Sequence, residues 1–182
     1  MKKNIIVIFT LSLLFSCENK SETIQITTEH NTQTPEKTPL EQLELEASRL
    51  RAGGSIKEVK FNDGKAEIFY VKNYEEYKKL QPQSSLTEDD LKAYWETGSA
   101  IEKALIDGSG RIMKNLDFVN EVRIELPYGG KVYSIDLKKE DLEKITDKSF
   151  EELKGNWSIF VDGFVYSTTG REKFFDMFGS VN

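Results

Sequence analysis

From residue 38 onward, apolar positions recur at helical spacing in two long segments and in several short ones. The first long segment opens with Thr38-Pro39-Leu40-Glu41, where Thr and Glu can form a capping box around a proline at the first helical position. It ends before Gly53-Gly54, because glycine pairs stop helices. The second long segment opens at Thr87 and carries an apolar face as far as Leu105. Shorter helices are predicted over residues 73–80, 111–116, 139–145 and 149–154 and from Thr169 onward.

Between these segments, apolar and polar positions alternate as they do in β-strands. The turns Asp63-Gly64, Gly129-Gly130 and Asp162-Gly163 each join two such runs, so the sequence predicts three hairpins. The run over residues 65–72 is apolar on both faces, which indicates an interior strand, whereas residues 118–126 are apolar on one face only. The six predicted strands cover residues 56–61, 65–72, 118–126, 131–137, 157–161 and 164–167.

The order of these elements predicts an α+β fold of two layers. Two hairpins enclose the second long helix, which gives a ββαββ core with an antiparallel sheet and helices mainly on one face. The third hairpin and a short helix follow at the C-terminus. Gly98 in mid-helix indicates a close approach to the sheet, and Asp107-Gly108-Ser109-Gly110 is expected to interrupt or end the helix. The Gly108-Ser109-Gly110 segment lacks the further glycines of a phosphate-binding loop, so a helix end or kink is favoured over a ligand site.

A different pattern occupies the N-terminus. Lys2 and Lys3 precede an apolar run over residues 5–15, which is typical of a secretory signal and short of the about 20 residues that span a bilayer. The run ends in Leu14-Phe15-Ser16-Cys17, which resembles the lipobox of bacterial lipoproteins. The resemblance implies that residues 1–16 are a signal peptide and that Cys17 becomes the mature N-terminus, with acyl chains such as palmitate attached. The alternative is an incidental thiol behind an ordinary signal peptide or an uncleaved anchor.

The segment after the lipobox predicts a tether. Residues 17–37 are polar apart from Ile24 and Ile26, so they bury too little surface to offset the entropy of ordering and are expected to be disordered. Residues 38–182 have the size of a single globular domain. Glu18 takes the place of the Asp that favours inner-membrane retention in some lipoproteins, so an extracytoplasmic location at the outer membrane or cell surface is preferred.

Charge and composition limit the partners. The chain has 25 Lys and Arg against 31 Asp and Glu, and removing Lys2 and Lys3 with the signal leaves 23 against 31, a net charge of −8. An acidic protein without a basic stripe is a poor candidate for nucleic acid. The expected partners are therefore the membrane, through the lipid on Cys17, and an envelope protein.

The predicted domain also lacks the most versatile catalytic side chains. The only histidine, His30, lies in the tether, and Cys17 is the only cysteine. Catalytic triads, zinc clusters and haem ligation are thereby excluded, and we expect neither a cofactor nor a metal. Carboxylates remain as candidates, in the sets Glu88, Asp89 and Asp90, and Asp147, Glu151 and Glu152, although charge at helix N-termini explains both sets.

The C-terminal segment is rich in aromatic residues. Core packing is the first interpretation, but Trp157, Phe175 and Phe178 would form a binding surface if they were exposed together. The sequence therefore predicts a lipid-anchored, non-catalytic envelope domain that binds a protein or another envelope component. The alternatives are a carboxylate-dependent hydrolase of envelope polysaccharide and a small-molecule carrier with a cavity between sheet and helix.

Overall fold

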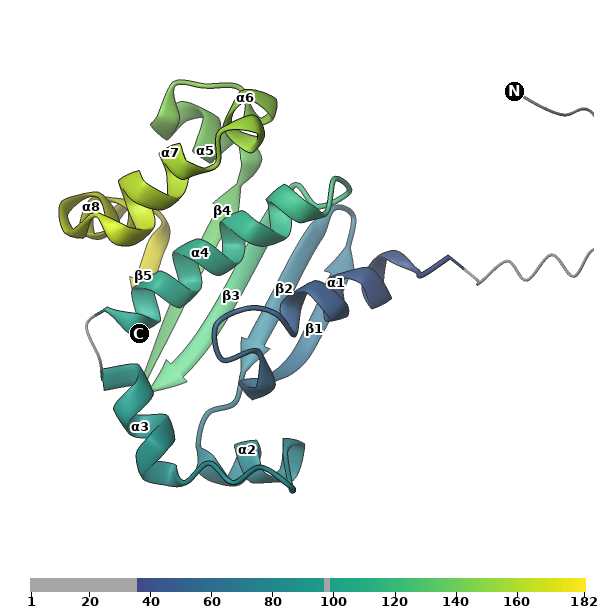
Figure 1. Ribbon diagram of the computed structural model, residues 1–182, viewed down its shortest axis with the longest axis vertical. Coiled ribbons are helices and arrows are strands. Elements are labelled where there is room, and N and C mark those ends of the chain that lie inside the picture. The colour runs from purple at the N-terminus through teal and green to yellow at the C-terminus, as the bar shows by residue number, and fades with distance from the viewer. Residues whose placement is uncertain (1–35, 97–98) are drawn as a thin grey trace, which may run out of the picture. The chain divides into compact units, whose positions relative to one another are not determined.

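A five-stranded sheet lies beneath a layer of helices in the computed structural model, which describes residues 36–96 and 99–182 (Figure 1). The predictions for the signal peptide, for Cys17, for the tether as far as residue 35 and for Gly98 concern residues outside these ranges. The strands are β1 (Ile56–Asn62), β2 (Lys65–Tyr70), β3 (Glu121–Tyr128), β4 (Lys131–Lys138) and β5 (Gly179–Val181).

The helices cover most of the positions that the sequence marks as helical. They are α1 (Pro39–Ala47), α2 (Tyr74–Leu80), α3 (Glu88–Glu96), α4 (Ala100–Asn115), α5 (Lys139–Thr146), α6 (Phe150–Gly155), α7 (Ser158–Phe160) and α8 (Thr168–Phe178), with a 3-10 turn η1 (Gly53–Ser55) and a π-helix η2 (Val161–Tyr166). The capping box predicted at Thr38 forms, and a second capping box forms at Ser149. The second long segment makes two helices, α3 and α4, rather than one.

The strands follow the chain order β1-β2-β3-β4-β5 across the sheet, so β2 is an interior strand, as predicted. The pairs β1–β2, β3–β4 and β4–β5 are antiparallel, but β2 and β3 run parallel. The expectation of a purely antiparallel sheet is therefore wrong at its centre. Between β2 and β3 the chain passes through α2, α3 and α4, and α4 packs on β3, which is the kind of helical crossover that parallel neighbours need.

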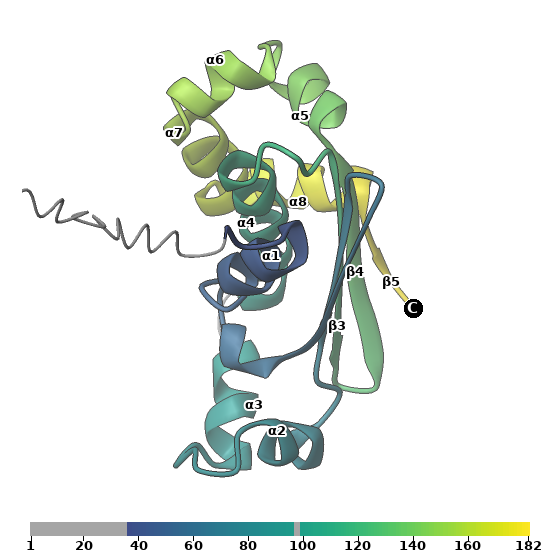
Figure 2. The same cartoon turned by 90° about the vertical axis from the view of Figure 1, so that its right-hand side faces the viewer.

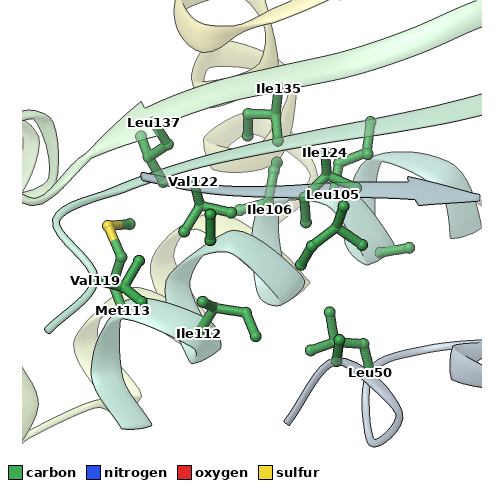
Figure 3. Close-up of a cluster of buried hydrophobic side chains, with 14 of the residues drawn as sticks. Leu50, Leu105, Ile106, Ile112, Met113, Val119, Val122, Ile124, Ile135 and Leu137 are labelled. Atoms are coloured by element: carbon green, nitrogen blue, oxygen red, sulfur yellow. The ribbon is translucent and has the colours of Figure 1, made fainter. Parts of the chain in front are cut away.

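The helices lie on one side of the sheet (Figure 2). On that side Val122, Ile124 and Leu126 of β3 are buried and meet the apolar face of α4, as Figure 3 shows for Val122 and Ile124. The opposite face carries charged residues in complementary rows, such as Lys65 opposite Glu121. The alternation predicted for this strand is confirmed, and the α+β class with helices mainly on one face is confirmed with it.

Residues 158–166 are helical, in α7 and η2, so the strands expected at 157–161 and 164–167 are wrong. Phe160 and Val165 are fully buried and Trp157 and Phe164 pack beside them, which is the spacing of a helical face. This helical burial overrides the strand preference of aromatic residues. The last antiparallel pair is made instead by β4 and by β5, the strand that follows helix α8 in the chain.

The glycines of Asp107-Gly108-Ser109-Gly110 do not end the helix, because α4 continues to Asn115. A Cβ on Gly110 would lie 2.5 Å from Phe160 Cε1. Gly110 therefore lets the helix beginning at Ser158 approach α4 closely, and the expectation of a helix end or kink is corrected to a packing role.

Candidate functional site

A hollow of about 540 Å³ opens between the loop after α1, helix α4 and the α7–η2 helix. It is larger than three other hollows found over the described residues, of about 170, 250 and 390 Å³. We call it the basic hollow. Its polar lining consists of Arg49, Arg51, Asp107, Arg111, Lys114 and Tyr166, with Asn115 beside them and Leu50, Trp157 and Val161 as apolar wall.

The charge of this lining is opposite to that of the chain as a whole. Three of the five arginines in the sequence, Arg49, Arg51 and Arg111, lie on it together with Lys114. Asp107 is the one carboxylate among its described lining residues, and Glu46 lies directly behind Arg49. The hollow thus keeps a net charge of about +2 in a protein whose formal charge is −6.

The loop that carries Arg49 and Arg51 is held in one conformation by its backbone. Ala52 has a left-handed φ of 50°, and a Cβ on Gly53 would lie 2.2 Å from the Ser48 carbonyl oxygen, so only glycine fits there. The hydroxyl of Tyr70 donates to the Arg51 carbonyl at 2.8 Å. Burial raises the pKa of Tyr70, so this hydroxyl stays a donor throughout the physiological range.

Leu50 orients the loop, since its side chain packs into the core (Figure 3). Its two neighbours, Arg49 and Arg51, line the hollow. On one side, Arg49 Nη1 lies 3.3 Å from Glu46 Oε2. On the other, Arg51 Nε lies 3.4 Å from Asp107 Oδ2, and Arg51 Nη2 donates to the Tyr166 hydroxyl at 3.3 Å. Arg51 therefore links the loop, α4 and η2. Its partial burial lowers its pKa, but Asp107 and Tyr166 more than offset this, so the net shift is upward and the guanidinium stays charged.

Two further cations have no counter-charge. Arg111 and Lys114 stand one turn apart on α4, where like charges repel, and within residues 36–96 and 99–182 neither side chain has a carboxylate partner. The ammonium of Lys114 lies 5.4 Å from the ring centroid of Trp157. An incoming anion is therefore expected to gain most of its electrostatic binding free energy from Arg111 and Lys114.

The walls of the hollow also contain hydrogen-bond donors in excess. Trp157 Nε1 is buried and no described residue accepts a hydrogen bond from it, whereas Arg51 Nε, also buried, has its ion-pair partner Asp107 Oδ2 at 3.4 Å but makes no hydrogen bond. A buried donor without an acceptor costs about 1–3 kcal/mol. The side chains that line the hollow include three arginines and one lysine as donors and one carboxylate as acceptor, a balance that suits an oxyanion.

The third wall is built on an uncommon helix. Tyr166, which is 59% exposed, and Val161 come from the π-helix η2. Helices of this kind are rare, and those that occur are often found at functional sites. The π-helical backbone of η2 thus borders the basic hollow.

The three aromatic residues predicted as a binding surface are all half-buried and do not share one exposed patch. Trp157 lines the basic hollow and packs against Phe160 at a centroid distance of 4.9 Å. Phe178 packs against Phe174 at 4.9 Å, and Phe175 covers Gly179 on the side of β5. Buried rings connect Trp157 to Phe178, so a binding role among the three is best supported for Trp157.

The carboxylate sets stabilise helix ends. Asp90 accepts hydrogen bonds from Thr87, and Glu152 accepts them from Ser149, which lowers the pKa of both carboxyl groups. A general acid at neutral pH needs the opposite shift. Glu88 pairs with Lys92 at 2.9 Å, and Asp147 ends α5 in a left-handed conformation. Among the described residues no group of three or more His, Cys, Asp or Glu is placed to hold a metal ion.

Two smaller hollows of about 170 and 250 Å³ flank helix α3. Both are below the volume of about 300–1,000 Å³ that is usual for small-molecule sites. Across the described ranges, no helix is long and apolar enough to cross a membrane.

The sequence analysis missed the basic hollow, because its cations come from segments about 60 residues apart in the chain. The one local signal was the pair Arg111 and Lys114, two like charges one turn apart on the same helix. Comparison of the chain with family models, curated proteins and solved structures found no match.

Proposed function

We propose that this chain is a lipid-tethered, non-catalytic binding module of the cell envelope, whose domain captures an anionic envelope component in the basic hollow. The observation that carries the proposal is the convergence of four cations, two of them without counter-charge, on one hollow of an acidic domain. Anions are the ligands that such a surface concentrates, since a concave site of one charge sign focuses the field.

A binding role is favoured over a catalytic one by the lining itself. Its single carboxylate, Asp107, is engaged in an ion pair with Arg51, and the lining offers no second carboxylate to act with it as an acid–base pair. Residues 38–182 contain neither histidine nor cysteine that could replace it. Capture and release of a charged group need only the cations and the preformed loop.

The tether predicted from the sequence would make a weak site sufficient. A flexible segment of residues 17–37 has an r.m.s. span of roughly 25 Å, which keeps the domain near the membrane to which Cys17 is attached. Tethering of this kind gives effective ligand concentrations in the millimolar range. A component of the same membrane would then be bound even with a dissociation constant of about 100 μM.

The proposal is tested on two levels. Mass spectrometry of the mature protein is expected to show an acylated N-terminal Cys17, and a Cys17→Ser variant is expected to leave the membrane fraction. An unmodified thiol in the mature product would refute the tether.

The second level uses isothermal titration calorimetry on the full chain in an uncharged detergent, with glucose 6-phosphate and glucose 6-sulfate as anionic probes. We expect saturable binding of at least one probe, lost in the double variant Arg111→Gln/Lys114→Gln. Arg123→Gln, on the opposite face of the sheet, is the matched control and is expected to bind like the wild type. Absence of binding by both probes would refute the anion site.

A further inference from the structure

The balance of charges in the basic hollow points to a particular class of anion. Arg49 and Glu46 form a pair at one side, Arg51 and Asp107 form a second pair, and Tyr166 contributes a neutral hydroxyl. Arg111 and Lys114 remain unpaired within the described parts of the chain. The hollow therefore offers two uncompensated positive charges.

We propose that the ligand group is a dianion of the phosphomonoester type, such as the phosphate of a sugar phosphate or of a phosphorylated lipid headgroup. This inference rests on the proposed function and adds the chemistry of the ligand. A phosphomonoester carries a charge of about −1.5 to −2 at pH 7 and offers three terminal oxygens as acceptors. Sulfate esters and phosphodiesters carry one charge, which would leave one of the two cations uncompensated.

The kind of side chain supports the same class. The guanidinium of Arg111 is planar and can donate two parallel hydrogen bonds to two oxygens of one phosphate, which an ammonium cannot do. Lys114, one turn away, is placed to reach a third oxygen as a point charge. The rim around them adds the exposed ring of Tyr166, which gives a sugar or another organic body a surface to lie on.

The composition of the domain makes this inference easy to test. Aspartate and glutamate titrate near pH 4 and lysine near pH 10, and residues 38–182 contain no histidine or cysteine that would titrate in between. Between pH 5.5 and 7.5 a pH dependence of binding must therefore come from the ligand. His30 is the only histidine of the sequence, so the measurements use a His30→Gln background.

The experiment measures the affinity of the full chain for glucose 6-phosphate and for glucose 6-sulfate at pH 5.5 and 7.5 in the same detergent. Since the second pKa of a phosphomonoester is about 6, its dianionic fraction rises about fourfold over this interval. We expect the phosphate ester to bind about fourfold more tightly at pH 7.5 than at pH 5.5. The sulfate ester is expected to show no change and to bind about tenfold more weakly than the phosphate ester at pH 7.5.

The variants assign the effect to the hollow. Arg111→Gln and Lys114→Gln are each expected to abolish most of the preference for phosphate over sulfate, whereas Arg123→Gln is expected to keep it. Thermal melting of each variant separates loss of binding from loss of the fold. Preservation of the preference in both hollow variants would overturn the inference.

The remaining outcomes separate this inference from the proposed function. Equal, pH-independent binding of both esters would overturn the dianion inference and leave the anion site in place, and binding of neither would overturn both. Vesicles containing phosphatidic acid, offered to the Cys17→Ser chain, distinguish the two sources of phosphomonoester. Tighter binding to these vesicles than to glucose 6-phosphate would place the group on a lipid, and the reverse order would place it on a sugar.

Discussion

Replacement of single glycines by alanine tests the packing of α4 beneath the basic hollow. A Cβ at position 110 would lie 2.5 Å from Phe160 Cε1 and 3.1 Å from Trp157 Cζ2, and Phe160 is fully buried. Alanine gains about 1 kcal/mol of helix propensity over glycine, but overpacking of a buried site costs about 1–3 kcal/mol and occasionally more. We expect Gly110→Ala to lower the free energy of unfolding by about 1–2 kcal/mol, because Phe160 and Trp157 have to move.

Two other glycines provide matched controls. A Cβ on Gly155, at the end of α6, would meet no atom within 4 Å, so Gly155→Ala is expected to stabilise by about 0.5–1 kcal/mol. A Cβ on Gly108 would lie 3.1 Å from Ile124 Cδ1, the end of a side chain that can shift, and Gly108→Ala is expected to be nearly neutral.

Urea unfolding followed by tryptophan fluorescence gives the three free energies of unfolding. The expected order of stability is Gly155→Ala above Gly108→Ala above Gly110→Ala, with the first variant more stable than the wild type. If Gly110→Ala were as stable as Gly155→Ala, the close approach of Phe160 to α4 would be refuted. A weaker anion affinity in Gly110→Ala is expected as well, since Trp157 forms one wall of the hollow.

Three further perturbations address the loop, the ion pair between Arg171 and Glu102, and the pH. Tyr70→Phe removes the hydroxyl that fixes the Arg51 carbonyl, so we expect a loss of about 1–3 kcal/mol in urea unfolding together with weaker anion binding. Arg171→Met leaves Glu102 without its partner at 3.0 Å, and because that carboxylate is partly exposed we expect a loss of about 2–3 kcal/mol in the same assay. The hydrogen bond from Lys65 lowers the pKa of Glu121, so its contribution to stability is present above the ordinary value of 4.5 and is lost as the pH falls through the lower folded value. Thermal melting is therefore expected to be flat from pH 5.5 to 7.5 and to fall below about pH 4.5.

Each of these has a clear contrary result. Unchanged anion affinity in Tyr70→Phe would mean that the loop keeps its conformation without the hydrogen bond from the Tyr70 hydroxyl to the Arg51 carbonyl. An Arg171→Met domain as stable as the wild type would remove the role of that ion pair in joining α8 to α4. A melting temperature that changes between pH 5.5 and 7.5 in the His30→Gln background would contradict the absence of a titrating side chain in the domain.

The sequence correctly predicted those helices and turns that are specified by a motif of a few consecutive residues. The capping box at Thr38 places the start of α1 correctly, and the Asp63-Gly64 turn places the first hairpin. In β3 the strict alternation identifies the buried face, because a strand with one solvated face repeats every two residues. These features depend on backbone conformation and on burial along a single element.

The features that the sequence did not reveal depend on contacts between distant segments. The parallel pairing of β2 and β3 follows from the way α4 returns the chain across the sheet, which no turn motif encodes. The helical form of residues 158–166 depends on burial against α4 and α8, since the residues themselves favour strands. Likewise, Arg51 and Arg111 meet only because the loop after α1 packs beside α4.

The most direct test of the basic hollow as an anion site is a titration of the ¹⁵N-labelled full chain with glucose 6-phosphate, followed by NMR. The chain has two tryptophans, and only Trp157 lines the hollow, whereas Trp95 lies on α3. Our account predicts that the indole N–H signal of Trp157 and the amide signals of the loop after α1 shift in a saturable way, while the indole signal of Trp95 stays in place. A titration that leaves the Trp157 signal unmoved, or that moves the signals of the open sheet face instead, would contradict it.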